Sequence, residues 1–181
     1  FTDYNAHGFY TDDHGKTFHL SQTVALAGSN ESMATALSAD RLMMNSRNQK
    51  GDIRARIVSI SSDGGATWDS TYFDHNLPDP VNQGSILTLE NTPARRAAGQ
   101  EKAIIAFCNA ADTQQRNNLT LRISYDEGKT WKKNIVIAKS AHNDEDHSAY
   151  SDIVRLTGKR IGILYEKADY SKIVFAEVKW R

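Results

Sequence analysis

Four side chains able to take part in chemistry stand where short strand-like segments begin or end. Glu31 and Arg47 lie 16 residues apart near the two ends of SNESMATALSADRLMMNSRNQ, at 29–48, and a two-strand hairpin brings such ends to one side of a sheet. Arg116 precedes LTLRIS, and Tyr150 precedes SDIVRL. A guanidinium group binds a carboxylate through two parallel hydrogen bonds, which lysine does not reproduce. Taken singly, each charge also fits an exposed strand end, and Tyr150 also fits a packed aromatic ring.

The elements that must hold these side chains are short β-strands. Helix patterns are scarce, and the apolar segments are short, often alternating, and bounded by Gly, Asp, Asn and Lys. This pattern predicts an all-β sandwich, barrel or propeller of roughly a dozen strands. The stretches at 91–102 and 141–148 are expected to be loops, the second because its charges are costly to bury. The predicted strand segments are GFYT, HLSQTVA, RLMMNS, ARIVSIS, STYFD, GSILTLE, KAIIAFC, LTLRIS, NIVIAK, DIVRL, RIGILYE and KIVFAEVKW.

One eight-residue pattern occurs three times in the chain. It reads Ser or Thr, any residue, Asp, any residue, Gly, any residue, Thr, aromatic. The aspartates Asp13, Asp63 and Asp126 are separated by 50 and 63 residues. Periods near fifty residues, with about four strands each, are typical of propeller blades. The copies are TDDHGKTF at 11–18, SSDGGATW at 61–68 and SYDEGKTW at 124–131.

Each repeat stands between two predicted strands, which places it on a hairpin. The Asp side chain can accept hydrogen bonds from backbone N–H groups of the turn, and the Gly permits a positive φ. The Thr hydroxyl can bond back across the turn. Phe18, Trp68 and Trp131 are expected to anchor the three turns in an apolar layer. The repeats are therefore interpreted as structural fasteners, with an Asp-x-x-x-Thr calcium or ligand site as the alternative.

The repeated pattern resembles the Asp-box of sialidases (neuraminidases) and of several other β-propellers. Three copies at blade-like spacing imply an all-β propeller, with six blades when complete and about three in this chain. Asp-boxes also occur in propellers without sialidase activity, so function has to rest on other residues.

The four side chains named first are similar, in the same order, to the site of that family. The resemblance implies that Tyr150, in SAYSD, is the catalytic nucleophile and that Glu31 is its base. It implies that Arg47 and Arg116 are two members of the arginine triad that binds the substrate carboxylate. Arg122, within the strand, fits the triad less well than Arg116.

Three further residues resemble positions around the same site. Glu166, in ILYEKADY, matches a Glu that usually supports one arginine of the triad. Gln83, in NQGS, matches a residue facing the glycerol side chain of the sugar, and Asn109, in FCNAAD, stands where the family often has an Asn by the ligand. For Gln83 and Asn109, a polar loop residue bonded to backbone is an equal alternative.

The resemblance implies an exo-α-sialidase that hydrolyses terminal sialic acid from glycoconjugates with retention, through a tyrosyl covalent intermediate. A trans-sialidase, including an intramolecular one, shares every residue above. A non-catalytic Asp-box propeller that binds glycans or proteins is a further alternative, and it expects Tyr150 and Glu31 to lie apart. A purely structural repeat protein expects no clustering of Arg47 and Arg116. Linkage preference is not encoded in these residues.

Two parts of the family's site have no counterpart here. The family has its general-acid Asp and its first triad arginine in the N-terminal part of the propeller. That arginine stands in an Arg-Ile-Pro-like segment. In this chain Arg54 and Arg56 lie in DIRARIV, which has no Pro. We therefore expect residues 1–181 to be the C-terminal half of a sialidase catalytic propeller. The N-terminal half is expected on a separate chain, held non-covalently, and this chain alone is expected to be inactive.

The charge and the apolar composition of the chain limit the classes of partner to expect. Lys plus Arg and Asp plus Glu both number 22, so the formal net charge is zero and nothing favours nucleic acid or an anionic membrane as partner. No apolar window is long enough for a membrane span. Cys108 is the single cysteine, so no internal disulfide forms. The expected partners are sialylated glycoconjugates and the N-terminal fragment.

No cofactor or metal is expected. The six histidines are scattered, and His142 and His147 share a charged loop without a convincing third ligand. A secreted or periplasmic location is favoured because sialidase substrates are mostly extracellular, with a lysosomal one as alternative. Sequons at Asn30 and Asn118 flank the predicted site, where a glycan would hinder substrate, which mildly favours a source that leaves them unmodified.

Overall fold

The computed structural model describes residues 4–91, 99, 102–140 and 147–181 as thirteen β-strands in four antiparallel sheets. The predicted loops at 91–102 and 141–148 lie mostly outside these described residues. Within them, no helix is long and apolar enough to cross a membrane. The all-β prediction is confirmed.

The sheets are built from strands consecutive in sequence, as propeller blades are. The first sheet pairs β1 (Phe9–Tyr10) with β2 (His19–Leu20). The second has the order β3 (Ser29–Ala36), β4 (Leu42–Asn48), β5 (Ala55–Ser61) and β6 (Ser70–Pro78). The third has β7 (Gly84–Glu90), β8 (Ile104–Ala110), β9 (Leu119–Ser124) and β10 (Lys133–Ala138). The fourth has β11 (Ser151–Leu156), β12 (Arg160–Lys167) and β13 (Lys172–Lys179).

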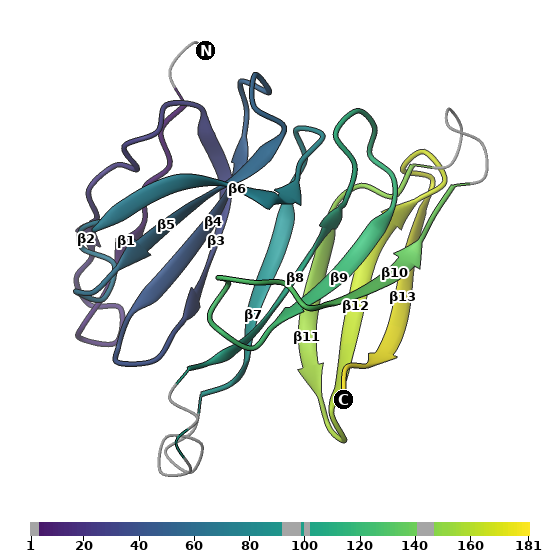
Figure 1. The fold of residues 1–181 in the computed structure, drawn as a ribbon. Helices are drawn as coiled ribbons and strands as arrows, with labels where there is room; N and C mark the ends of the chain where they lie inside the picture. The colour runs from purple at the N-terminus through teal and green to yellow at the C-terminus, as the bar shows by residue number, and fades with distance from the viewer. Residues whose placement is uncertain (1–3, 92–98, 100–101, 141–146) are drawn as a thin grey trace.

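The sheets stand side by side in an open fan (Figure 1), from β1–β2 at the left of the view to β11–β13 at the right. Strand β7 packs against both β3 and β11, so the first strands of the three larger sheets are neighbours and the later strands lead outward. This is the arrangement of blades around a propeller axis. The prediction of a partial propeller of about three blades is confirmed.

Apolar layers between neighbouring sheets hold the fan together. Between the second and third sheets, Val58 and Leu77 pack with Ile105 and Phe107. A larger cluster joins the third and fourth sheets, and all of its most buried members are apolar. That cluster contains Leu89, Ile104, Ala106, Cys108, Leu119, Leu121, Ile123, Ala138, Ile153, Ile161, Ile163, Tyr165 and Trp180. Burial of such side chains is the main source of stability in a sheet assembly.

The Asp-boxes form the turns between β1 and β2, between β5 and β6, and between β9 and β10. In the second box, the Ser61 hydroxyl donates to Asp63 at 2.8 Å and accepts the Gly65 N–H at 2.8 Å. The Asp63 carboxylate accepts the Thr67 N–H at 2.9 Å and the Thr67 hydroxyl at 2.6 Å. The other two boxes repeat these bonds. The hydrogen bonds from Thr67 lower the pKa of Asp63 to about 2. The carboxylates thus fasten their own turns.

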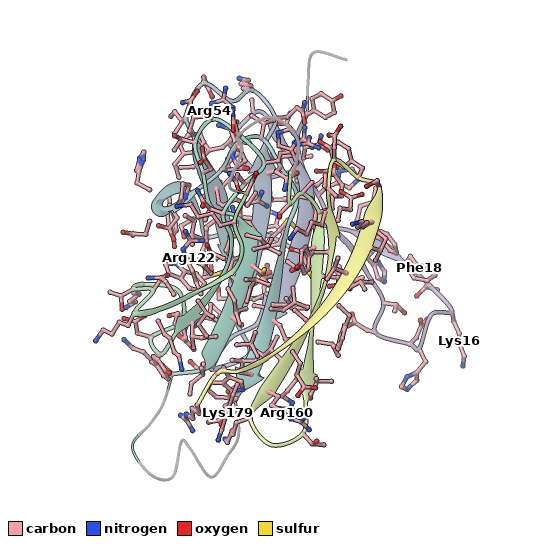
Figure 2. The ribbon with its side chains drawn as sticks, turned by 90° about the vertical axis from the view of Figure 1, so that its right-hand side faces the viewer. Lys16, Phe18, Arg54, Arg122, Arg160 and Lys179 are labelled. Atoms are coloured by element: carbon pink, nitrogen blue, oxygen red, sulfur yellow. The ribbon has the colours of Figure 1, made fainter. Side chains whose placement is uncertain are left out.

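The aromatic residues that close the boxes differ in burial. Trp131 is 9% exposed and its Nε1–H donates to Asp74 Oδ2 at 3.1 Å. Trp68 Nε1–H donates to the Gln22 carbonyl at 2.9 Å. Phe18 is 60% exposed and projects at the edge of the molecule (Figure 2), touching Phe9 edge-to-face. The prediction that Phe18 anchors its turn in an apolar layer is wrong, because β1 and β2 form only a two-stranded sheet.

Truncating the two aromatic residues should therefore have unequal effects. We expect Trp131→Ala to lower the free energy of unfolding by about 3–5 kcal/mol, through the cavity it leaves and the loss of the donor to Asp74 Oδ2. Phe18→Ala should change the free energy of unfolding by roughly 0.5 kcal/mol or less. Urea denaturation of both variants, followed by far-ultraviolet circular dichroism, measures the difference. Equal losses would show that Phe18 is covered in the folded protein.

Candidate active site

The four residues predicted to act together converge in the structure. The Tyr150 hydroxyl donates a short hydrogen bond to Glu31 Oε1, across 119 residues of sequence. Arg47 Nη1 donates to Glu31 Oε2 at 2.8 Å and to the Tyr150 hydroxyl at 3.1 Å. The Arg116 guanidinium lies over the Tyr150 ring, 5.6 Å from its centroid. One phenol is thus surrounded by one carboxylate and two cations.

A β-bulge aims Glu31 and Arg47 at each other. Ser29 pairs with Asn48 and Ser32 pairs with Ser46, so two residues of β3 face one residue of β4. The two are Asn30 and Glu31, and the one is Arg47. Bulges of this kind redirect a side chain and are common beside active sites.

Tyr150 directly precedes β11, and Glu166 of β12 lies opposite it. The Glu166 carboxylate accepts the Tyr150 N–H at 3.1 Å, and the Glu166 N–H donates to the Tyr150 carbonyl at 3.0 Å. The resemblance implies that Glu166 supports an arginine. Its carboxylate holds the backbone of Tyr150, because the strand pairing places it directly across from that residue. The support of an arginine by Glu166 stays a prediction.

Gln83 and Asn109 have different surroundings. Gln83 Oε1 accepts the Ser151 N–H at 3.0 Å, and the side chain lines a cavity beside Tyr150. Asn109 is fully buried, donating from Nδ2 to the Pro78 carbonyl at 2.8 Å and accepting from Arg122 Nη1 at 3.1 Å. Both ends of the Asn109 amide are therefore used inside the fold, and the structure removes it from the candidate ligand contacts.

Arg116 is held by groups that the sequence analysis did not single out. Its Nη1–H donates to the Tyr170 hydroxyl at 3.2 Å, and its guanidinium lies 6.0 Å from the Tyr170 ring centroid. Its Nη2–H donates to the Val81 carbonyl at 3.5 Å. Tyr170 stands within the quoted ILYEKADY segment, but no spacing rule connects it with Arg116, 54 residues earlier.

The electrostatic setting keeps the Tyr150 phenol protonated. Burial raises the pKa of Tyr150 most, and the hydrogen bond to Glu31 and the negative charge of Glu31 raise it further. The positive charges of Arg47 and Arg116 oppose this rise in pKa. The neutral phenol therefore donates its proton toward Glu31, which is the geometry needed for transfer to a base.

Two cavities flank the Tyr150–Glu31 pair. The larger has a volume of about 490 Å³ and is lined by Ser32, Met33, Gln83, Tyr150, Ser151, Asp152, Leu164, Tyr165, Glu166 and Ile173. The other has a volume of about 390 Å³ and is lined by Tyr4, Asn5, Ala6, His7, Ser29, Asn30, Glu31 and Ser32. Tyr150 borders the first cavity and Glu31 borders the second.

The histidine pair considered in the 141–148 loop is only partly described. His142 lies outside the described residues. His147 Nδ1 is 3.4 Å from Asp169 Oδ1, and its ring stacks on Tyr170. Among the described residues, no group of three or more His, Cys, Asp or Glu side chains is arranged to hold a metal ion.

A fan of Asp-box blades with a tyrosine, a glutamate and two arginines gathered at one point defines a β-propeller of the sialidase type. The chain belongs to the BNR repeat-like domain family, whose model matches residues 1–165. It is 32% identical to a sialidase of Micromonospora viridifaciens over 164 residues, covering 90% of this chain and 24% of the relative. It is 30% identical to a sialidase of Bacteroides fragilis over 176 residues, covering 97% of this chain and 30% of the relative.

A solved structure shows the same fold. A Hadza microbial sialidase matches with a TM-score of 0.76 at 27% identity, covering 95% of this chain and 31% of that chain. The chain thus spans less than a third of the length of these relatives.

Proposed function

We propose that this chain forms part of the active site of an exo-α-sialidase, which releases terminal sialic acid from glycoconjugates with retention of configuration. The observation that carries the proposal is the Tyr150 hydroxyl bonded to Glu31 and Arg47. The names of the relatives support it. A non-catalytic propeller expects Tyr150 and Glu31 to lie apart, whereas they are hydrogen-bonded.

The chemistry of a sialoside explains a tyrosine in this role. The anomeric carbon of sialic acid already bears a carboxylate, which would repel an anionic Asp or Glu nucleophile. A neutral phenol avoids that repulsion, and sialidases are an exception to the two-carboxylate rule. As the Tyr150 oxygen bonds to the anomeric carbon, its proton passes to Glu31 and the glycosidic C–O bond breaks. The leaving oxygen takes a proton from an acid that lies outside these 181 residues. Water then cleaves the tyrosyl intermediate, giving one proton to the conjugate base of that acid, and Glu31 returns its own proton to Tyr150.

The arginines bind the substrate carboxylate in this proposal. Arg47 lies at the hydroxyl of Tyr150, and Arg116 lies over the face of its ring. A carboxylate bound between the two arginines would therefore lie next to the nucleophile. Holding that carboxylate near the ring plane favours the flattened, oxocarbenium-like transition state over the ground state.

The remaining parts of the site are proposed to come from residues outside these 181. They are an acid that protonates the leaving oxygen, and a third arginine. The exposed apolar side chains of the fourth sheet support a further blade packing there, because patches of this kind mark interaction surfaces. They are Val154, Leu164, Ile173 and Phe175.

The test combines an activity assay with intact-mass analysis of the native material. We expect a fluorogenic α-sialoside to be hydrolysed, a β-galactoside with the same leaving group to be left intact, and the first product by NMR to be the α-anomer. Mass analysis should find additional polypeptide, on this chain or on a second one, co-purifying with activity. Folded native protein that hydrolyses no sialoside would overturn the proposal and favour a binding module.

A further inference from the structure

A buried ion pair lies behind the candidate site. Arg56 Nη1 is 3.2 Å from Asp79 Oδ2, and both side chains are almost completely buried. Burial lowers the pKa of the Arg56 guanidinium from its usual value, and the charge of Asp79 opposes that change. Buried pairs gain little net stability, because desolvation offsets their attraction. The stability of the fold therefore does not explain why this pair is present.

Asp79 begins the segment 79–83, which connects β6 to β7 and so joins the second and third sheets. Asp79 Oδ1 accepts the Asn82 N–H at 2.8 Å, which closes the turn. Asp79 Oδ2 accepts the Asn48 N–H at 3.3 Å. Asn48 follows Arg47 directly, so the Asp79 carboxylate holds the backbone next to one substrate-binding arginine.

The far end of the segment holds Tyr150, which directly precedes the fourth sheet. Fully buried Asn82 donates from Nδ2 to the Ala149 carbonyl at 2.8 Å. Gln83 Oε1 accepts the Ser151 N–H at 3.0 Å. The residues on both sides of Tyr150 are therefore bonded to the segment. Arg56 secures this end too, since its Nη1–H donates to the Asn82 carbonyl.

The middle of the segment contacts Arg116, the second arginine of the candidate site. The Val81 carbonyl accepts Arg116 Nη2 at 3.5 Å. Val81 has a φ of 63°, a left-handed conformation that is unfavourable for a β-branched residue. Such strain persists only where the surroundings enforce it, and it concentrates at functional sites.

We propose that the segment 79–83, secured by the Arg56–Asp79 pair, is the positioning element of the active site. It fixes Tyr150 and Arg116 relative to Arg47, although Arg47 lies in the second sheet and the other two precede strands of the fourth and third sheets. Arg56, Asp79 and Asn82 act through the backbone beside the reacting groups and do not touch substrate. The inference rests on the proposed sialidase function and extends it.

The test is Asn82→Ala in the native sialidase, since this change removes the bond to Ala149 and leaves every substrate-contacting side chain in place. We expect kcat to fall about 10–100-fold with KM changed far less, because a small misplacement of a reacting group has an effect of that size. The rate at which a fluorosialyl fluoride labels Tyr150 covalently should fall by the same factor. Asp79→Asn should act in the same direction.

Glu127→Gln is the matched control. Glu127 is also a buried carboxylate paired with an arginine, Arg41, and it accepts two backbone N–H groups, from Ser38 at 2.7 Å and Ala103 at 3.1 Å. It lies in the third Asp-box, away from Tyr150. Its loss should lower thermal stability and leave kcat and the labelling rate at wild-type values.

The outcomes separate the two proposals. Wild-type protein without sialidase activity would reject the proposed function itself. Active wild type with an Asn82→Ala variant of unchanged kcat and labelling rate would overturn the positioning role alone. If Asn82→Ala does not fold, Asp79→Asn takes its place, because it keeps the shape of the side chain and leaves every substrate-contacting side chain unchanged. A folded Asp79→Asn variant with unchanged labelling rate would then overturn the role.

Discussion

Replacing Tyr150 with Phe should reduce kcat for an α-sialoside on the order of 10⁴-fold, the scale seen when a nucleophile is removed. The change deletes one oxygen and leaves the ring beneath the Arg116 guanidinium. The backbone bonds from Tyr150 to Glu166 do not involve the phenol. Folding should therefore be preserved while covalent catalysis is lost.

Three measurements test this expectation. Steady-state hydrolysis gives kcat, thermal unfolding shows whether the variant is folded, and mass spectrometry after exposure to a fluorosialyl fluoride shows whether residue 150 is labelled. Tyr125→Phe, a more exposed tyrosine inside the third Asp-box, should retain wild-type activity. A folded Tyr150→Phe variant that turns over at more than about a tenth of the wild-type rate would exclude Tyr150 as nucleophile.

The parts of the fold that follow from local patterns were predictable from sequence. ARIVSIS, GSILTLE and LTLRIS begin and end as the strands β5, β7 and β9 do. Their apolar side chains and flanking turn residues decide these boundaries, with little help from the rest of the chain. The Asp-box turns were equally readable, because every bond in them joins residues within four positions of each other.

The boundaries that depend on distant groups were not predictable. STYFD suggests a strand ending at Asp74, whereas β6 runs to Pro78 with a register shift beside Ala55. Phe18 has the same place in its repeat as Trp131, yet only Trp131 has a neighbouring sheet to pack on. Burial of an aromatic side chain is decided by what stands opposite it, and a local motif does not carry that information.

The candidate site shows the same division. The resemblance of their segments to the sialidase site identified Glu31, Arg47, Arg116 and Tyr150, which the structure brings together. The hydrogen bonds behind these residues could not be predicted from the sequence. The bond from Asn82 to Ala149, for example, joins residues 67 positions apart, and no sequence pattern marks such a pair. Arg56 drew attention only as a poor match to a missing triad arginine, and its burial explains why it does not serve as one.

The second large effect is expected for Glu31→Gln, which keeps the shape of the side chain and removes the base. We expect kcat at neutral pH to fall about 10³-fold, within the usual contribution of general-base catalysis. Glu31 raises the pKa of Tyr150, and Arg47 and Arg116 lower it, so removing the negative charge lowers the pKa of the phenol. The ionised fraction of Tyr150 in the variant then grows as pH rises. The phenolate needs no base to react, but the substrate carboxylate repels it, so the recovery should be partial.

The activity of Glu31→Gln should therefore recover toward alkaline pH, whereas wild-type activity should show no such rise. A pH–rate profile of both proteins, restricted to the range in which each stays folded, measures the difference. Glu177→Gln is the matched control, because Glu177 also pairs with an arginine, Arg160, at 2.5 Å, on the exposed part of the fourth sheet. A Glu31→Gln profile parallel to that of wild type would mean that another group accepts the proton, and Glu31 would then only orient Arg47.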